Sequence, residues 1–154
     1  MFEDLRDLYQ DVILQHGRKP VHMHRLEQFD ATGKGDNPMC GDRVQVWIAY
    51  AKDGAIAETG FEARGCAISI ASADLMVESV AGLQPGAVRD LFAGFEQMVR
   101  SGVCPECEPS VVSAMDRLKP LSGVHEYPSR VKCATLPWYA LVAALDGEKE
   151  ASNG

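Results

Sequence analysis

The sequence predicts an α+β fold, in which helices pack on an antiparallel sheet. The first observation is that apolar side chains recur at every second position of residues 44–50, which is typical of a strand. The second is the Asp-Gly turn at residues 52–54, after which a second alternating segment runs to Arg64. Most of the remaining chain has apolar residues at helical spacing. We therefore expect a hairpin covered by helices.

We expect one domain at residues 1–146, followed by a polar tail at residues 147–154. The chain has 154 residues, which is the usual size of a single domain. Apolar residues make up 46% of it, so the core does not need a metal ion in order to fold. A metal ion bound here would therefore have a functional role.

The N-terminal part is predicted to begin with an amphipathic helix that Gly17 and Pro20 terminate. Its apolar residues recur at helical spacing and are Leu5, Leu8, Tyr9, Val12 and Ile13. A short edge strand is expected at residues 25–31. Residues 32–36 (TGKGD) are interpreted as a turn, because two glycines interrupt the segment.

Four further helical segments are predicted after the hairpin. Residues 67–76 form a helix rich in small side chains, and a longer helix begins at Pro85 and ends at Gly102. A short helix contains Met115, and residues 120–128 are interpreted as a loop. The last helix is complicated by Pro137, so it either starts near residue 136 or is kinked there.

Composition and charge exclude several classes of function. The formal net charge is −7, and no basic cluster is interleaved with aromatic residues, so nucleic acid and anionic membranes are poor partners. The longest nearly apolar segment, residues 136–145, is too short to span a bilayer. The N-terminus has no basic segment of the kind that begins a signal peptide. We expect a cytoplasmic protein.

Five cysteines indicate metal binding or thiol chemistry, because an odd number in a chain without an export signal does not suggest a disulfide framework. Cys40 lies two residues before Asp42 in the turn formed by residues 37–42 (NPMCGD), so one bend carries two metal-type ligands. Two cysteines elsewhere, Cys66 and Cys133, are candidates to complete the site.

The predicted topology brings these residues together. The start of the first hairpin strand and the end of the second lie at the same end of an antiparallel pair, which places Asp42 near Cys66. Cys66 is at the N-terminus of a helix, where the helix dipole favours a thiolate, and Cys133 is expected at or before the start of the last helix. Three sulfur atoms and one carboxylate are a ligand set that suits zinc. Nearby basic residues that could offset the charge are Arg43, Arg64, Arg130 and Lys132.

Other candidate ligands are less favoured. Cys104 and Cys107 form a CxxC pair, but two thiols do not close a zinc site, and we interpret them as an incidental surface pair. His22 and His24 are interpreted as solvated loop residues because no third ligand is near them in the sequence. His125 is a less favoured substitute ligand near the last cysteine.

Three segments resemble the cysteine motifs of the IscU/NifU-N iron–sulfur assembly family. They are residues 37–42 (NPMCGD), 65–69 (GCAIS) and 130–136 (RVKCATL), in the order found in that family, and the resemblance extends from about Leu5 to Leu145. Within the family the chain is similar to the SufU branch, because the stretch between the second and third motifs is long and Lys132 stands where IscU scaffolds have histidine. The Leu-Pro-Pro-Val-Lys motif of those scaffolds is absent.

The resemblance implies a three-stranded antiparallel sheet with helices packed on it, and a zinc ion held by Cys40, Asp42, Cys66 and Cys133. It further implies that Cys40 accepts sulfur from a SufS-type cysteine desulfurase after a histidine of that partner replaces it on the metal. Arg130 matches an arginine of the SufU motif, which implies that it stabilises the site or the docked partner. The alternative is an ordinary surface arginine that covers a carboxylate.

The function implied is that of a zinc-dependent sulfurtransferase, a persulfide acceptor that stimulates the desulfurase and supplies the downstream iron–sulfur assembly machinery. The alternative is an IscU-like scaffold, on which an iron–sulfur cluster is assembled at the same ligands and then transferred. A third hypothesis is a purely structural zinc domain.

Overall fold

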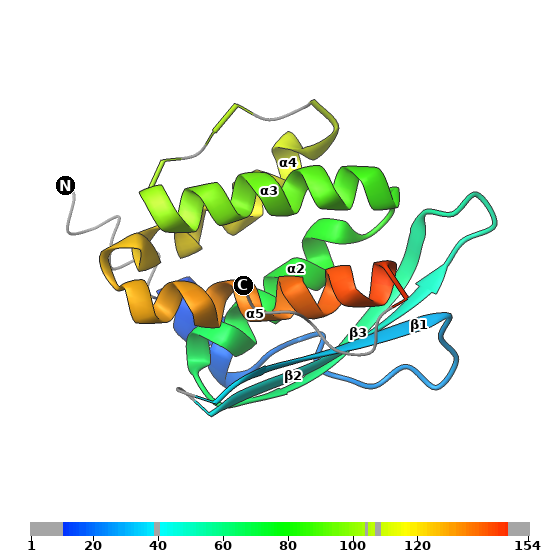
Figure 1. The fold of residues 1–154 in the computed structure, drawn as a ribbon, viewed down its shortest axis with the longest axis horizontal. Coiled ribbons are helices and arrows are strands. Elements are labelled where there is room, and N and C mark those ends of the chain that lie inside the picture. The colour runs from blue at the N-terminus through cyan, green and yellow to red at the C-terminus, as the bar shows by residue number, and fades with distance from the viewer. Residues whose placement is uncertain (1–10, 39–40, 104, 107–108, 148–154) are drawn as a thin grey trace.

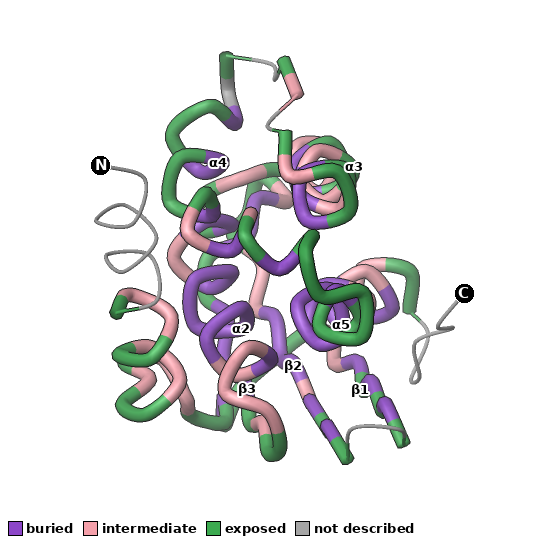
Figure 2. The backbone as a smooth tube through the Cα atoms, turned by 90° about the vertical axis from the view of Figure 1, so that its left-hand side faces the viewer, coloured by how far each residue is buried: buried purple, intermediate pink, exposed green. Residues whose placement is uncertain are grey.

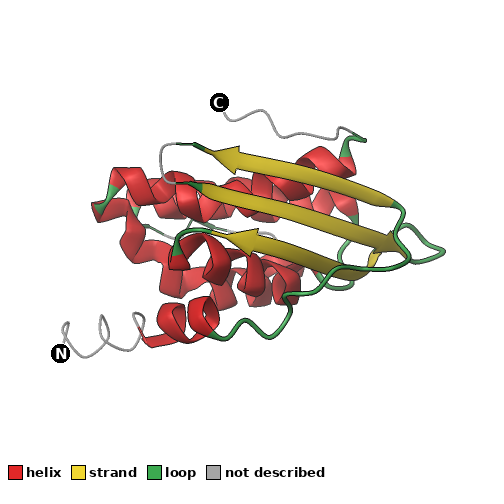
Figure 3. Cartoon of the chain, turned by 90° about the horizontal axis from the view of Figure 1, so that it is seen from below, coloured by secondary structure: helices red, strands yellow, loops and turns green. Residues whose placement is uncertain are grey.

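The sheet has three antiparallel strands in the order β1 (Ala31–Asn37), β2 (Asp42–Tyr50) and β3 (Ile56–Arg64). A computed structural model describes residues 11–38, 41–103, 105–106 and 109–147. The described helices gather on one face of the sheet, and none of them covers the opposite face (Figures 1 and 3). The α+β class and the three-stranded sheet are thus confirmed.

The hairpin of β2 and β3 forms as its sequence predicts. Val44, Val46 and Ile48 alternate toward the core and are buried. The turn closes through a hydrogen bond from the Ala51 N–H to the Ala55 carbonyl at 2.8 Å, and Gly54 supplies the positive φ of 88° that the turn requires.

The first strand is where the sequence interpretation was wrong. Residues 32–36 are not a turn, and the expected strand at residues 25–31 is displaced, because β1 covers Ala31–Asn37. Gly33 and Gly35 lie within β1, where the last helix packs so closely on the strand that no side chain fits. A Cβ at Gly33 would clash with the Ala140 carbonyl oxygen, and one at Gly35 would lie 2.9 Å from the Leu136 side chain. These glycines permit close packing instead of interrupting the strand.

Residues 23–24 lie along the free edge of β3, and residues 25–26 lie over the uncovered face of the sheet. Met23 and His24 form isolated bridges with Phe61 of β3, and Leu26 is buried against Gly60. This segment therefore covers one part of that face without forming the regular strand that the sequence suggested.

Two layers of helices follow above the sheet (Figure 1). The inner layer contains α2 (Ala67–Val80) and α5 (Pro128–Leu145), which are largely buried (Figure 2). The outer layer contains α3 (Pro85–Ser101) and α4 (Val112–Leu118). All four predicted helices are present, although α2 extends four residues beyond its predicted end and α5 begins earlier than expected, and residues 11–18 are also helical. Leu5, Leu8 and Tyr9 of the predicted first helix lie outside the described residues.

Two short 3-10 helices, η1 (Pro109–Val111) and η2 (Lys119–Glu126), flank α4. The second replaces the loop expected at residues 120–128. Its side chains Leu121 and Val124, three residues apart, are buried and anchor this turn in the core. Because a 3-10 helix has three residues per turn, both side chains lie on the same face, which explains why this segment is helical and not a loop.

The last helix begins at Pro128 and passes through Pro137, so the expected start near residue 136 is wrong. A proline inside a helix costs roughly 3 kcal/mol, but the residues after it are deeply buried. Trp138 is fully buried, stacks on Phe95 and donates its indole N–H to the Ser72 hydroxyl at 3.2 Å. These contacts compensate for the interrupted helical bond. None of the described helices is long and apolar enough to cross a membrane.

Candidate metal centre

Asp42, the first residue of β2, is completely buried. Its Oδ1 atom accepts a hydrogen bond from the backbone N–H of Cys66 at 2.7 Å. The pairing of Arg43 with Arg64 places the start of β2 beside the end of β3, so the antiparallel register explains this contact. Asp42 and Cys66 are therefore in contact, as predicted.

Cys66 is the N-cap residue of α2 and is partly exposed. The preceding Gly65 has a φ of 116°, and a Cβ at this position would clash with Oδ1 of Asp42. Only glycine therefore lets the chain turn from β3 into α2 while the Asp42 carboxylate lies against the turn.

Arg130 connects α5 to the same site. This residue is in the first turn of α5, and its Nη1 atom donates to Sγ of Cys66 at 3.0 Å. The N-terminal turn of α5 thus docks at the end of the sheet where β2 begins and β3 ends. A guanidinium at this distance stabilises negative charge on the sulfur atom.

Cys133 lies one helical turn beyond Arg130, inside α5 and fully buried. The expectation that it lies at or before the helix start was wrong, because Pro128 begins the helix five residues earlier in the chain. Its thiol faces the Ser129 carbonyl with an S···O distance of 3.8 Å. Cys40, Cys104 and Cys107 lie outside the described residues.

The second oxygen of the Asp42 carboxylate has no hydrogen-bond partner among the described residues, although it is buried. A buried carboxylate oxygen without a partner costs free energy unless a cation or a donor approaches it. Carboxylate oxygen and cysteine sulfur are both zinc ligands, so Asp42 and Cys66 have the chemistry that this metal requires. Within the described ranges, no three His, Cys, Asp or Glu side chains are grouped closely enough to hold a metal ion.

The histidines take part in other contacts. The His22 ring contacts Glu78 at 3.1 Å and is partly buried, so its interpretation as a solvated residue was wrong. The exposed His24 contacts the His22 carbonyl at 3.1 Å through its ring. Nδ1 of His125 contacts the Ser122 carbonyl at 2.9 Å.

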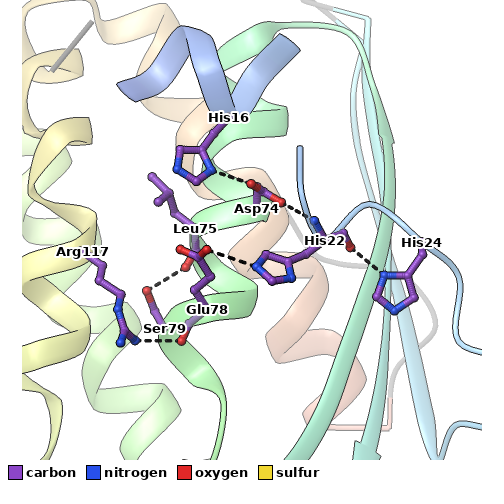
Figure 4. Close-up of polar contacts among 8 residues, drawn as sticks. All are labelled: His16, His22, His24, Asp74, Leu75, Glu78, Ser79 and Arg117. Atoms are coloured by element: carbon purple, nitrogen blue, oxygen red, sulfur yellow. Dashed lines mark hydrogen bonds and ion pairs between the residues drawn. The ribbon is translucent and has the colours of Figure 1, made fainter. Parts of the chain in front are cut away.

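Asp74, which the sequence did not indicate as a site residue, is completely buried in α2. Its two carboxylate oxygens contact Nδ1 of His16 at 2.5 Å and the backbone N–H of His22 at 2.7 Å (Figure 4). The helix at residues 11–18 is also close to the start of α2, since a Cβ at Gly17 would lie 2.8 Å from the Ala67 carbonyl oxygen. Asp74 therefore fixes the N-terminal helix next to the turn that carries Cys66. The available signal was a charged residue within the predicted helix at residues 67–76, whose other residues are apolar or small.

Comparison with known proteins identifies the family. The family model for the NifU-like N terminal domain matches residues 8–134. The chain belongs to this family. This NifU-like domain is 33% identical over 147 residues to the zinc-dependent sulfurtransferase SufU of Bacillus subtilis, with 95% of each chain covered. It is 30% identical over 149 residues to the iron-sulfur cluster assembly scaffold protein IscU of Streptococcus pyogenes, with 97% of this chain and 89% of the relative covered.

Solved structures of similar proteins have the same fold as this NifU-like domain. The N-terminal part of a nitrogen-fixing NifU-like protein from Brucella abortus superposes with a TM-score of 0.78 at 22% identity, covering 92% of this chain and 94% of the other. A SUF-system scaffold candidate from Fervidobacterium islandicum has a TM-score of 0.75 at 28% identity, covering 91% and 98%.

Proposed function

We propose that this protein is a zinc-dependent sulfurtransferase that accepts persulfide sulfur from a SufS-type cysteine desulfurase and passes it to iron–sulfur cluster assembly. The proposed zinc ligands are Cys40, Asp42, Cys66 and Cys133. The observation that carries the proposal is the buried Asp42 carboxylate, which has one oxygen without a partner among the described residues and lies against the Cys66 turn. The SufU relative, named a zinc-dependent sulfurtransferase, supports the same assignment.

The ligand residues would have different roles. The Cys66 N–H orients the Asp42 carboxylate through Oδ1, so that Oδ2 is directed to a single position. A carboxylate is also a more exchangeable ligand than a thiolate, which suits a site that must open for a partner. Bound zinc would hold the cysteines as thiolates, the form that is nucleophilic.

The transfer step is a thiol–persulfide exchange at Cys40. The Cys40 thiolate attacks the outer sulfur of the donor persulfide, so a new S–S bond forms while the S–S bond of the donor breaks. The donor cysteine leaves as a thiolate, and no external oxidant or reductant is consumed. Arg130, whose guanidinium contacts Sγ of Cys66, would limit the accumulation of negative charge at this site.

The alternative is a scaffold on which an iron–sulfur cluster is assembled at the same ligands. The relatives named IscU scaffold proteins support it at the level of the family. Lys132, in the position where IscU scaffolds have histidine, and the long segment between Cys66 and Cys133 favour the sulfurtransferase.

The test combines metal content, an absorption spectrum and a desulfurase assay on freshly purified protein. We expect one zinc per chain, no visible absorption, and stimulation of a SufS-type desulfurase that Cys40→Ala abolishes. Cys104→Ala is the matched control and should stimulate as the wild type does. Visible charge-transfer absorption after anaerobic reconstitution, with transfer of a cluster to an apo-protein, would instead support the scaffold. Normal stimulation by Cys40→Ala would exclude Cys40 as the acceptor.

A further inference from the structure

The uncovered face of the sheet has a hollow of about 860 Å³ at the end where the candidate metal centre lies. The side of the sheet opposite the helices is visible in Figure 3. The hollow lies between residues 23–25, beside β3, and residues of all three strands. The strand residues that line it are at positions 34–36, 43–45 and 62–64.

Basic side chains predominate in this hollow. Arg25, Lys34, Arg43 and Arg64 line it, together with only two carboxylates, Asp36 and Glu62. The whole chain has 15 Lys and Arg against 22 Asp and Glu. The hollow therefore contains about a quarter of the basic residues but only about a tenth of the acidic ones. Its local charge is opposite in sign to the net charge of −7.

Strand alternation separates this basic surface from the metal ligands. Asp42 faces inward and is completely buried, whereas the side chain of the next residue, Arg43, is 73% exposed on the outer face. Arg64 follows the same rule on β3, two residues before Cys66. The hollow thus borders the candidate metal centre, and its charge can be changed without altering a proposed ligand.

One wall of the hollow is held in place by packing. Leu26 is buried against Gly60, and the guanidinium of Arg25 lies 5.5 Å from the centre of the Trp47 ring. Arg25 is therefore positioned at the wall before any partner binds, which reduces the entropy lost on docking.

We infer that this hollow, lined by Arg25, Lys34, Arg43 and Arg64, is the docking site for an acidic surface segment of the protein that donates sulfur to the candidate metal centre. The inference rests on the proposed function, because a donor must approach the end of the sheet where Asp42 and Cys66 lie. Charges that border an interface accelerate association and select partners of opposite sign, and their effect extends over roughly 8 Å at physiological salt.

The test reverses charge in the hollow and, as a matched control, at the far end of the sheet. Lys34→Glu with Arg43→Glu changes the charge of the hollow, and Lys52→Glu with Arg89→Glu makes the same change near the β2–β3 turn. Binding to a SufS-type desulfurase is measured by calorimetry at low and high salt, with zinc content determined for each protein. We expect the hollow variant to bind about tenfold more weakly or worse at low salt, with its zinc retained, and the control to bind within about twofold of the wild type.

A second variant tests the same inference in the opposite direction. Glu62→Gln removes one of the two carboxylates of the hollow with little change in shape, so it should bind the desulfurase more tightly at low salt. Equal affinities of the hollow variant, the control and the wild type would overturn the inference while leaving the sulfurtransferase proposal intact. A wild-type protein that neither binds nor stimulates the desulfurase would overturn both. Loss of binding to a duplex DNA probe alone would assign the hollow to nucleic acid and also overturn the inference.

Discussion

Asp42 is a fully buried carboxylate with a single hydrogen-bond partner identified among the described residues, the Cys66 N–H. Such a group destabilises the folded protein unless a cation or a second donor offsets the cost of its burial. Metal binding is the role that its position beside Cys66 supports. Replacing this residue should therefore weaken zinc binding without destabilising the metal-free protein.

We expect Asp42→Asn to weaken zinc binding at least about tenfold, while the metal-free variant is as stable as the metal-free wild type or more stable. The amide oxygen can still accept from the Cys66 N–H, but the negative charge is lost. Chelator competition measures the zinc affinity, and urea unfolding after metal removal measures stability. Asp36→Asn, at an exposed position of β1, is the control and should change neither property. A less stable metal-free Asp42→Asn protein with unchanged zinc affinity would contradict this account.

For individual residues, the sequence predicted contacts that follow from strand direction. It did not predict contacts that depend on how helices pack. Asp42 and Cys66 meet because antiparallel strands bring their positions together. Asp74 was not identified, because an aspartate within a helix is usually solvated, and only the docking of residues 11–18 buries it. The position of Arg130 in the motif came from the resemblance, whereas its contact with the Cys66 sulfur required the structure.

At the scale of elements, the packing of α5 on β1 depends on glycines that have no space for a side chain. We expect Gly33→Ala to lower the free energy of unfolding by about 2–3 kcal/mol, because its methyl group would clash with the backbone of α5 at Ala140. Gly86→Ala, in the exposed first turn of α3 with nothing within 4 Å of the added Cβ, should be neutral or stabilise by up to about 1 kcal/mol. Urea denaturation distinguishes the two. Equal stabilities would show that α5 can move away from β1 at little cost.

The attachment of the N-terminal helix to α2 is a second property at this scale. Asp74→Ala removes the acceptor for the His16 ring and the His22 N–H, so we expect the amides of residues 11–18 to exchange hydrogen faster. Amides of α5 should keep their protection. Glu78→Ala is the control, since it removes only the partly exposed contact with the His22 ring. Mass spectrometry of the exchanged peptides measures the difference, and unchanged exchange of residues 11–18 would show that apolar packing alone holds this helix.

Elements with a clear sequence pattern could be predicted. Elements whose form depends on packing against a neighbouring element could not. Alternation identified β2 and β3, and the Pro85 to Gly102 pattern identified α3. In the sequence the glycines of β1 resemble those of a turn, and only their packing against α5 explains their place in a strand. Pro137 suggested a late helix start because its cost is visible in the sequence, whereas the burial of Trp138 that compensates for it is not.

For the whole molecule, the size of the core predicts how the protein responds to loss of metal. The helices of both layers and the sheet bury a continuous apolar cluster that includes Phe61, Phe95 and Trp138. We expect the chelator-treated protein to keep its helical circular dichroism and to unfold cooperatively, at a lower temperature than the zinc-loaded protein. Re-addition of zinc should restore the melting temperature in proportion to the logarithm of its concentration. Complete unfolding on chelation would indicate that zinc is structural.

The packing of α5 against β1 also determines when the protein can fold during its synthesis. The first strand contacts the last helix, so β1 has no partner for its glycine-lined face until the segment that forms α5 has been synthesised. Cys133 is carried by that same late helix. The last of the proposed ligands therefore joins the site only when α5 packs on the sheet and closes the core.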